Sequence, residues 1–421
     1  MLPELIEIVP PSRPIDATVV LPGSKSITNR ALILAALADA TVTLRGALWS
    51  EDTQAMVECL ERLGFAVRVQ DADAEPANRS ITVEGRGGQI PNAGSLAEPI
   101  ELFVANAGTA ARFLPPLLCL GYGACRLSGV PRMHERPQAA LIGALRALGY
   151  RIDTPNDRLP AVVHGGGPRP GASCRVSVAE SSQFASALLL SARIGGWKID
   201  VTGANEDELP YVDMTRRMVG DFPWGGGVYE IEADASGASY FWGADWLLRG
   251  DGSRIKVAPQ PKSGLQADQK FLDSVVRGSW RPTYSRRTDL ADSIMTAIVL
   301  APFAPTATRF TDLGRLRVQE CERVKALRTE LGKCGAKVEE SGDTLTIHPG
   351  NVHGAEIETY DDHRIAMCFS MLGLRVPGMR LRNPACVRKT FPNFFAKLAG
   401  VGVVVQDANT GKRLSGDELL A

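Results

Sequence analysis

The chain has 421 residues, which is too long for one ordinary hydrophobic core, so we expect two large domains or a repeat array. Hydrophobic residues make up 44% of the chain and charged residues 22%, values that exclude a disordered or fibrous protein. The formal net charge is zero, so bulk charge does not draw the protein towards nucleic acid or an acidic membrane. Any anion site must therefore concentrate positive charge locally.

The eight cysteines are scattered and show neither a C-x-x-C motif nor a zinc-like spacing. Several lie in apolar runs, which predicts buried, reduced thiols and a cytoplasmic protein. The five histidines form no metal-binding motif, so no metal is expected. No apolar run approaches the length of a membrane span, and the N-terminal residues lack the layout of a signal peptide.

The stretch LPGSKSITNR at 21–30 has a Gly-Ser-Lys-Ser core but fails as a P-loop. A P-loop places a lysine directly after its second glycine, with another glycine five residues earlier. Here Ser24 separates Gly23 from Lys25, and no glycine precedes Gly23. Nucleotide is therefore the weaker prediction, and Lys25 and Arg30 are candidates for binding another anion.

One kind of segment recurs six times along the chain: a short polar cluster that opens onto an apolar helical run. The six instances are 24–37, 106–118, 181–192, 234–245, 290–301 and 361–374. Each is typical of an N-cap followed by a largely buried helix. Helix starts carry unpaired N–H groups and partial positive charge, so several of them meeting in a cleft would form an anion site.

Amphipathic helices that run into a turn and a β-branched strand alternate with these segments. Clear cases are 52–69, 137–153, 322–340 and the shorter 392–405. The segments 211–231 and 269–285 are degenerate, because they lack the Leu-Gly corner at the end of the helix. Apolar residues at i, i+3, i+4 and i+7 predict the helices, with glycine as the C-cap. Strands are predicted at 41–47, 80–85, 174–178, 197–203 and 343–349. The chain is therefore interpreted as six irregular copies of an α-β-α-β unit in two domains of three, with generic α/β alternation as the alternative.

Basic residues sit at the openings of the apolar helices. They are Lys25, Arg30, Arg112, Arg132, Arg136, Arg317, Arg323, His363, Arg364 and Lys389. In a neutral protein this placement indicates a multiply charged anion, because the arginine fork binds phosphate and carboxylate oxygens bidentately. A surface ion pair is the alternative for any single one.

Carboxylates accompany these cations: Asp234, Asp292, Glu320, Asp361 and Asp362. An acid buried among arginines stays ionised and can act as a general base, whereas an acid in apolar surroundings can hold a proton. Helix capping is the alternative role for Asp234 and Asp292, and for Asp234 it is the preferred one.

With these motifs in view, the chain resembles the EPSP synthase (3-phosphoshikimate 1-carboxyvinyltransferase) family. The matching segments are LPGSKSITNRALILAALA, NAGTAARFL, PRMHERP, SSQFASALLLSA, PYVDMT, DASGASYF, DSIMTA, RVQECERVKALRTEL, YDDHRIAMCFSM and KTFPNFF, in order over nearly the whole length. The resemblance implies a two-domain inside-out α/β barrel of six repeated units, with the active site in the interdomain cleft. One domain would comprise about 1–22 plus 233–421, and 23–232 would form the other.

The resemblance also implies the reaction and its residues. The enolpyruvyl group of phosphoenolpyruvate would pass to the 5-hydroxyl of shikimate 3-phosphate with release of phosphate, in a monomer without metal or organic cofactor. Shikimate 3-phosphate would be held by Lys25, Ser26, Arg30, Ser181, Ser182, Gln183, Tyr211, Asp292 and Gln319. Phosphoenolpyruvate would be held by Lys25, Gly108, Arg136, Gln183, Arg323, Arg364 and Lys389. Asp292, Glu320 and Lys25 would carry the proton transfers, and the match at Gly108 implies inhibition by glyphosate in competition with phosphoenolpyruvate.

Three departures from the family pattern concern the acceptor. Arg315 and Gln319 stand where the family often has an asparagine and a lysine, and Glu208-Leu209 precedes PYVDMT where a serine commonly supports the acceptor phosphate. A related enolpyruvyl transferase acting on another hydroxyl is therefore one alternative. For the relative that acts on UDP-N-acetylglucosamine, the reactive-cysteine loop should lie near position 115, but Cys119 sits in an apolar run. A phosphosugar kinase, which the broken P-loop disfavours, and a non-catalytic anion-binding relative are two hypotheses from different classes.

Overall fold

The chain folds into two compact units in the computed structural model, which describes residues 2–71, 75–203 and 209–421. The terminal unit combines Met1–Leu21 with Ala233–Ala421, and the central unit is Pro22–Glu232. The chain leaves the terminal unit once and returns to it once, so the central unit is a single continuous insertion.

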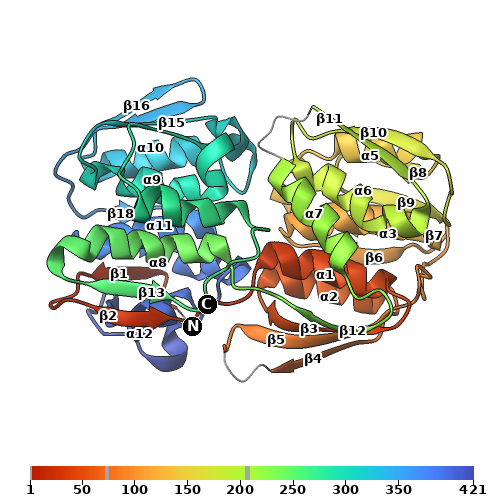
Figure 1. Cartoon of the computed structure of the whole chain (residues 1–421), viewed down its shortest axis with the longest axis horizontal. Coiled ribbons are helices and arrows are strands. Elements are labelled where there is room, and N and C mark those ends of the chain that lie inside the picture. Colours follow the sequence, from red (N-terminus) through yellow and green to blue (C-terminus); the bar gives the residue numbers. More distant parts are fainter. Residues whose placement is uncertain (1, 72–74, 204–208) are drawn as a thin grey trace. The chain divides into compact units, whose positions relative to one another are not determined.

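Three buried helices pack against one another inside the central unit (Figure 1). They are α1 (Lys25–Leu37), α3 (Gly108–Cys119) and α6 (Ser182–Gly195). All twelve residues of α3 are buried, and helices that are apolar on all sides belong in a core. The three predicted helices are therefore confirmed.

The terminal unit has a corresponding set of three helices that contact one another. They are α8 (Ala235–Leu248), α9 (Ile294–Leu300) and α11 (His363–Gly373). These helices are also confirmed, although α9 is short and begins only after a 3₁₀ turn at Ala291–Ser293. Asp234 accepts a hydrogen bond from the Gly237 amide at 2.6 Å, so its predicted capping role is confirmed.

Each unit contains two four-stranded sheets and one two-stranded sheet among its described residues. In the central unit they are β12-β3-β5-β4, β6-β7-β9-β8 and β10-β11, and in the terminal unit β14-β15-β17-β16, β18-β19-β1-β20 and β13-β2. Every four-stranded sheet pairs its first two strands in parallel and the rest antiparallel. Both two-stranded sheets are parallel. The N-terminal β1 completes a sheet of late strands, which ties the first residues to the C-terminal part.

The strands of the central unit have the following bounds: β3 (Thr41–Leu48), β4 (Val67–Asp71), β5 (Asn78–Glu84), β6 (Ile100–Phe103), β7 (Tyr122–Ser128), β8 (Arg151–Asp153), β9 (Ala161–Gly166), β10 (Ser173–Ser177), β11 (Lys198–Thr202) and β12 (Gly227–Glu230). Those of the terminal unit are β1 (Leu5–Val9), β2 (Asp16–Val19), β13 (Arg254–Val257), β14 (Thr283–Ser285), β15 (Thr308–Thr311), β16 (Val338–Ser341), β17 (Thr344–Ile347), β18 (Glu356–Ile357), β19 (Met379–Arg382) and β20 (Val404–Asp407). All five predicted strands are among them.

The amphipathic helices are α2 (Glu51–Arg62), α5 (Ala139–Ala147), α10 (Arg323–Lys333) and α12 (Phe394–Gly400). Each is followed by a glycine with positive φ: Gly64, Gly149, Gly335 and Gly402. A left-handed residue ends a helix at little cost only when it lacks a Cβ, so the four clear predictions are confirmed.

The two degenerate segments behave differently from each other. The first forms α7 (Leu209–Asp221), an α-helix. The second contains Leu272–Arg277, a short helix with i to i+5 hydrogen bonds. Both segments lack the Leu-Gly corner, and only the second departs from the α-helical geometry of the other copies.

The prediction of buried thiols is confirmed for seven of the eight cysteines. All eight thiols are free, and only Cys321 is partly exposed. Burial raises the pKa of all eight, for example that of Cys59 to about 12. These thiols therefore pack as small apolar groups at neutral pH.

Candidate active site

Asp292 lies at the start of α9 in the terminal unit and is surrounded by cations. Its Oδ1 accepts hydrogen bonds from Arg286 Nη2 at 2.9 Å and Nε at 3.2 Å, and Oδ2 is 3.7 Å from Arg364 Nη2. Gln319 Nε2 donates to Oδ2 at 3.4 Å. The preceding residue, Ala291, has a φ of 49°, a conformation that costs an L-residue about 1–3 kcal/mol and often accompanies functional sites.

The charges around Asp292 decide its protonation. Burial by itself raises the pKa of Asp292, but Arg286, Arg364 and Arg323 outweigh burial and hold the pKa well below its usual range. Asp292 is therefore a carboxylate at neutral pH, as a general base must be.

Arg323, the first residue of α10, connects the acidic side chains of this cluster. Its Nη2 is 2.8 Å from Glu320 Oε2, and its Nη1 donates to Gln319 Oε1 in a short hydrogen bond. Lys389 Nζ lies 3.2 Å from the other Glu320 oxygen. Both oxygens of Glu320 thus face a cation, while Arg323 itself is only 1% exposed.

Asp362 joins α10 to α11. It accepts hydrogen bonds from Arg323 Nε at 2.6 Å and Nη2 at 3.1 Å, and from the Arg364 amide at 2.9 Å as the N-cap of α11. Burial alone lowers the pKa of Arg323, but Asp362 and Glu320 reverse this effect and raise it. Arg364 is directed to Ser236 Oγ at 3.2 Å, which links the starts of α8 and α11.

Asp268 is a further carboxylate next to this cluster. It accepts a hydrogen bond from the Ser293 amide at 2.8 Å and is 4% exposed. Burial raises the pKa of Asp268 to about 6, with Arg364 opposing that rise. Two neighbouring acids, Asp268 and Asp292, are therefore shifted in opposite directions, which is common where acid–base chemistry occurs.

In the central unit, Lys25 lies beside a buried acid. Its Nζ is 3.0 Å from Asp52 Oδ2, and the Asp52 side chain is 3% exposed. Two residues earlier, Gly23 packs closely on another strand, since a Cβ at that position would lie 1.9 Å from the Gly46 carbonyl oxygen. The glycine of the GSKS stretch therefore serves close backbone packing in this region.

Arg30 is 2% exposed and connects four helices. Its Nε donates to Thr215 Oγ1 at 2.8 Å and its Nη2 to Ser186 Oγ at 3.3 Å. The guanidinium also lies 5.1 Å from the centre of the Phe113 ring. A third donor, Nη1, reaches the Ser26 carbonyl oxygen at 2.9 Å. Burial lowers the pKa of Arg30 to about 10, which leaves it charged at neutral pH.

Gly108, the first residue of α3, lies against Arg136. A Cβ at Gly108 would lie 2.9 Å from Arg136 Nη2 and 3.1 Å from Nη1. Arg136 Nη1 donates to the Asn106 carbonyl at 3.4 Å, and Arg136 Nε is buried with no hydrogen-bond partner in the described part of the chain. The glycine thus leaves room for a guanidinium at a helix start.

The remaining predicted substrate residues lie near the starts of α6 and α7. Ser181 caps α6 by accepting a hydrogen bond from the Gln183 amide at 3.2 Å, and Ser182 is buried. The Tyr211 carbonyl accepts from Thr215 Oγ1 at 2.9 Å and from Ser186 Oγ at 3.3 Å. Glu208, the acceptor-side departure, lies outside the described residues.

Two cations proposed from the sequence belong elsewhere: Arg132 pairs with Glu135 at the surface at 2.6 Å, and Arg317 forms a separate network. Arg317 pairs with Glu322, Glu340 and Asp343 at 2.8–3.0 Å, so it ties its loop to β16 and the β16–β17 turn instead of joining the cluster. With three carboxylates within reach, Arg317 is part of a structural ion-pair network.

The structure thus brings together two sets of the predicted residues. The first set is one connected cluster in the terminal unit, formed by Asp292, Gln319, Glu320, Arg323, Arg364 and Lys389. The second set lies in the central unit, at or against the N-terminal parts of α1 and α3, and consists of Lys25, Ser26, Arg30, Gly108 and Arg136. Sequence reasoning missed Asp52, Asp268 and Arg286. Arg286 in SRRTDLADS is only six residues before Asp292, and this short spacing was a signal that could have indicated the pair. No local signal in the sequence connects Asp52 with Lys25.

The described residues contain no group of three His, Cys, Asp or Glu side chains that could hold a metal ion. Within the same residues, no helix combines the length and the apolar character that crossing a membrane requires.

The known proteins that this chain resembles belong to one family. The model of the EPSP synthase (3-phosphoshikimate 1-carboxyvinyltransferase) family matches residues 9–225 and 286–398. The 3-phosphoshikimate 1-carboxyvinyltransferase of Nostoc punctiforme is 35% identical, with 94% of this chain and 98% of that protein covered. The enzyme of the same name from Opitutus terrae is 38% identical, with 94% and 97% covered. A solved structure of EPSP synthase from Acinetobacter baumannii aligns at a TM-score of 0.73 and 20% identity over 96% of this chain and 100% of that one, which shows a shared fold. Since the family model matches well over half of the sequence, the chain belongs to the EPSP synthase family of transferases.

Proposed function

We propose that this protein transfers the enolpyruvyl group of phosphoenolpyruvate to the 5-hydroxyl of shikimate 3-phosphate and releases phosphate. The observation that carries the proposal is the terminal-unit cluster. Asp292, Glu320, Arg323, Arg364 and Lys389 are linked there by ion pairs and by hydrogen bonds through Gln319 and Asp362. The reaction joins two anions, so it needs cations that offset their repulsion, and it moves protons, so it needs acid–base groups. The three cations and two carboxylates of the cluster supply both.

Asp292 is proposed as the general base. Its carboxylate is ionised because arginines surround it, and it would accept the proton of the 5-hydroxyl as the oxygen bonds to C2 of phosphoenolpyruvate. Anionic substrates would partly neutralise Arg286 and Arg364. The pKa of Asp292 would then rise towards its usual range, which makes it a stronger base once both substrates are bound.

Glu320, with Lys25, is proposed to deliver the proton to the methylene carbon. The C2–C3 double bond becomes single as C3 gains the proton and C2 gains the oxygen, which gives a tetrahedral intermediate. In the second step the C2–O bond to phosphate breaks, C3 returns a proton, and the double bond forms again. Because Arg323 and Lys389 hold both Glu320 oxygens, those cations would set how readily Glu320 accepts and releases that proton.

Several cations would bind the anionic groups of phosphoenolpyruvate. Arg364 and Lys389 of the terminal unit, together with Lys25 and Arg136 of the central unit, are proposed to hold phosphoenolpyruvate with the Gly108 backbone and Gln183. Arg323 is already saturated by acidic and amide partners, so its contact with the substrate would require one of them to move. The acceptor would be held by Lys25, Ser26, Ser181, Ser182, Gln183, Tyr211, Asp292 and Gln319. Arg30, which the sequence also assigned to the acceptor, is 2% exposed and donates to Thr215, Ser186 and the Ser26 carbonyl, so it would act by orienting Ser26.

The proposal is tested by measuring phosphate release from phosphoenolpyruvate with purified protein. Release should depend on added shikimate 3-phosphate. Release that depends instead on another hydroxyl acceptor would assign the protein to a different branch of the enolpyruvyl transferases. Arg315 and Gln319, which differ from the common family residues, would then be the first positions to exchange.

A further inference from the structure

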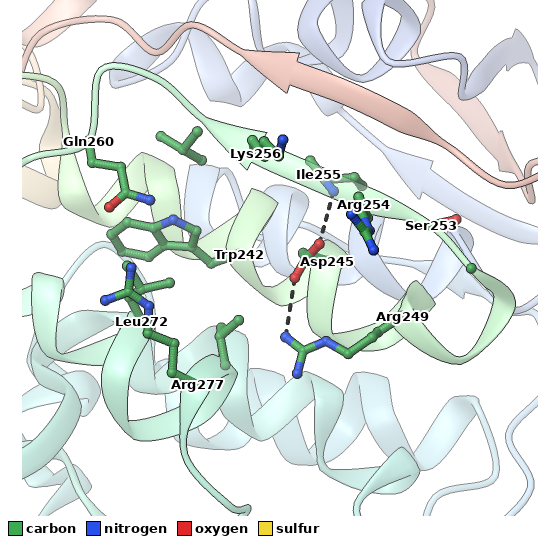
Figure 2. A pocket seen from close by; sticks show the side chains of 13 residues that line it. Trp242, Asp245, Arg249, Ser253, Arg254, Ile255, Lys256, Gln260, Leu272 and Arg277 are labelled. Atoms are coloured by element: carbon green, nitrogen blue, oxygen red, sulfur yellow. Dashed lines mark hydrogen bonds and ion pairs between the residues drawn. The ribbon is translucent and has the colours of Figure 1, made fainter.

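A pocket of about 550 Å³ opens in the terminal unit beside α8, β13 and the short helix Leu272–Arg277. Its 13 lining residues all fall between Trp242 and Arg277 (Figure 2). That span lies inside 226–285, the stretch that the family model leaves unmatched. None of the residues proposed above to bind substrate lines it, so the family's reaction does not account for this pocket.

The charged side chains of the pocket favour an anion. Four basic residues line it, namely Arg249, Arg254, Lys256 and Arg277, with Asp245 as the single carboxylate among the lining residues. Asp245 is already engaged, since it accepts hydrogen bonds from the Ile255 amide at 2.9 Å and from Arg249 Nη2 at 3.2 Å. Arg254 and Lys256 alternate with buried residues along β13 and are exposed on one face. Arg249 is paired with Asp245 and Arg277 with Asp273 at 3.0 Å, so the excess positive charge of the pocket comes from Arg254 and Lys256.

A buried donor lies in the same pocket. Trp242 is 3% exposed, and its Nε1 has no hydrogen-bond partner in the described part of the chain. A buried N–H left unsatisfied costs about 1–3 kcal/mol, so an acceptor brought by a ligand would be favoured there. In Figure 2 the indole lies beneath the Gln260 side chain, with Arg277 reaching towards it from the opposite side.

The edge of β13 adds backbone donors. The amides of Arg254 and Ala258 donate to the Ile15 and Val19 carbonyls of the β2 side at 2.6 and 2.9 Å. Because donors alternate along a strand, the amides of Ile255 and Val257 face the opposite edge, where Asp245 already accepts the first of them. Apolar side chains of Ile255, Val257, Leu272 and Val276 complete the lining.

We propose that this pocket binds a small organic anion that carries a carboxylate or phosphate on a flat apolar body. The acidic group is held by Lys256 and Arg254, and the flat body packs over Leu272, next to the small exposed parts of Trp242 and Val276. The volume is within the range of small-molecule sites, which is about 300–1,000 Å³. The site is formed by the terminal unit alone and does not depend on the proposed reaction.

Phenyl phosphate is the probe, titrated calorimetrically into the full chain. Lys256→Glu should weaken its binding about tenfold or more, since a charge-assisted contact becomes repulsive. Lys198→Glu is the matched control, because Lys198 is an exposed lysine on β11 of the central unit and the charge change is the same. Trp242→Phe keeps a ring but removes the N–H donor, and should weaken binding about fivefold.

The competing source of binding is the proposed substrate site, which also takes phosphates. Lys25→Ala should leave the pocket's affinity for phenyl phosphate unchanged, and Lys256→Glu should keep the parental rate of phosphate release. Affinity that falls with Lys25→Ala but not with Lys256→Glu would overturn the proposal. Inorganic phosphate bound as tightly as phenyl phosphate, with the same sensitivity to Lys256→Glu, would overturn the flat-body part of it.

Discussion

The stability of the terminal-unit cluster should depend strongly on Asp362, a fully buried carboxylate. It meets Arg323 Nε at 2.6 Å and Nη2 at 3.1 Å and also caps α11. The change Asp362→Asn keeps the shape of the side chain and the capping oxygen but removes the negative charge. Arg323, which is 1% exposed, then lacks one of its two carboxylate partners.

The expected loss follows from the geometry of the pair. Breaking a buried ion pair by removing one partner costs about 3–5 kcal/mol. Glu320 remains 2.8 Å from Arg323, so we expect the lower end, about 3 kcal/mol. In a domain of this size each kcal/mol changes Tm by about 2–4 °C, so Tm should fall by about 6–12 °C.

Differential scanning calorimetry at neutral pH measures the effect, with Asp273→Asn as the matched control. Asp273 forms a pair with Arg277 at a similar distance, 3.0 Å, but the two side chains are 73% and 61% exposed. Exposed pairs contribute about 0–1 kcal/mol, so the control should lower Tm by about 0–4 °C. If Tm falls by the same small amount in both variants, the buried Asp362–Arg323 pair stabilises the unit no more than an exposed pair does.

Three further outcomes are expected. The pKa of Asp268 is raised to about 6 in the folded protein, so between pH 4 and 6 the native state binds more protons than the unfolded chain and stability falls as pH rises. Asp268→Asn should therefore gain Tm relative to the parent between pH 4.5 and 7.5, and a constant difference in calorimetry would contradict this. Lys25→Ala should abolish phosphate release, and it should lower Tm because Asp52 is left buried without its lysine. In the double variant Lys25→Ala/Asp52→Asn, Tm should recover but turnover should not. Recovery of turnover would show that Lys25 takes no part in the chemistry. Gly108→Ala should raise KM for phosphoenolpyruvate and weaken competitive inhibition by glyphosate, because the new Cβ would lie 2.9 Å from Arg136 Nη2; steady-state kinetics with an unchanged KM would refute it.

Most local elements of this fold were predictable from the residues because the signals that determine them are short-range. The apolar run after Ser24 and the Leu-Gly corner at Gly64 specify a buried helix and a helix end within one or two turns of chain. Prediction was less successful where such a signal is weak. Of the two segments that lack the corner, the one containing Leu272 forms a short helix of different geometry, whereas the other forms the α-helix α7.

The candidate site was predictable in part. The basic residues at helix openings drew attention to Arg364 and Lys389, and both contact the carboxylate cluster. For Arg317 the ion-pair alternative applies, which the residues alone left open because a sequence does not show which carboxylates a neighbouring hairpin will bring near.

The sequence by itself determined the helices, the strands, the glycine turns and the residue types that an anion-handling enzyme needs, since each follows from periodicity or chemistry within a short stretch. Only the tertiary structure determined which side chains pair with one another. Asp52 meets Lys25 across 27 positions, and Asp362 meets Arg323 across 39. Burial and long-range ion pairing set the charge state of a side chain, and both arise only when distant segments pack together.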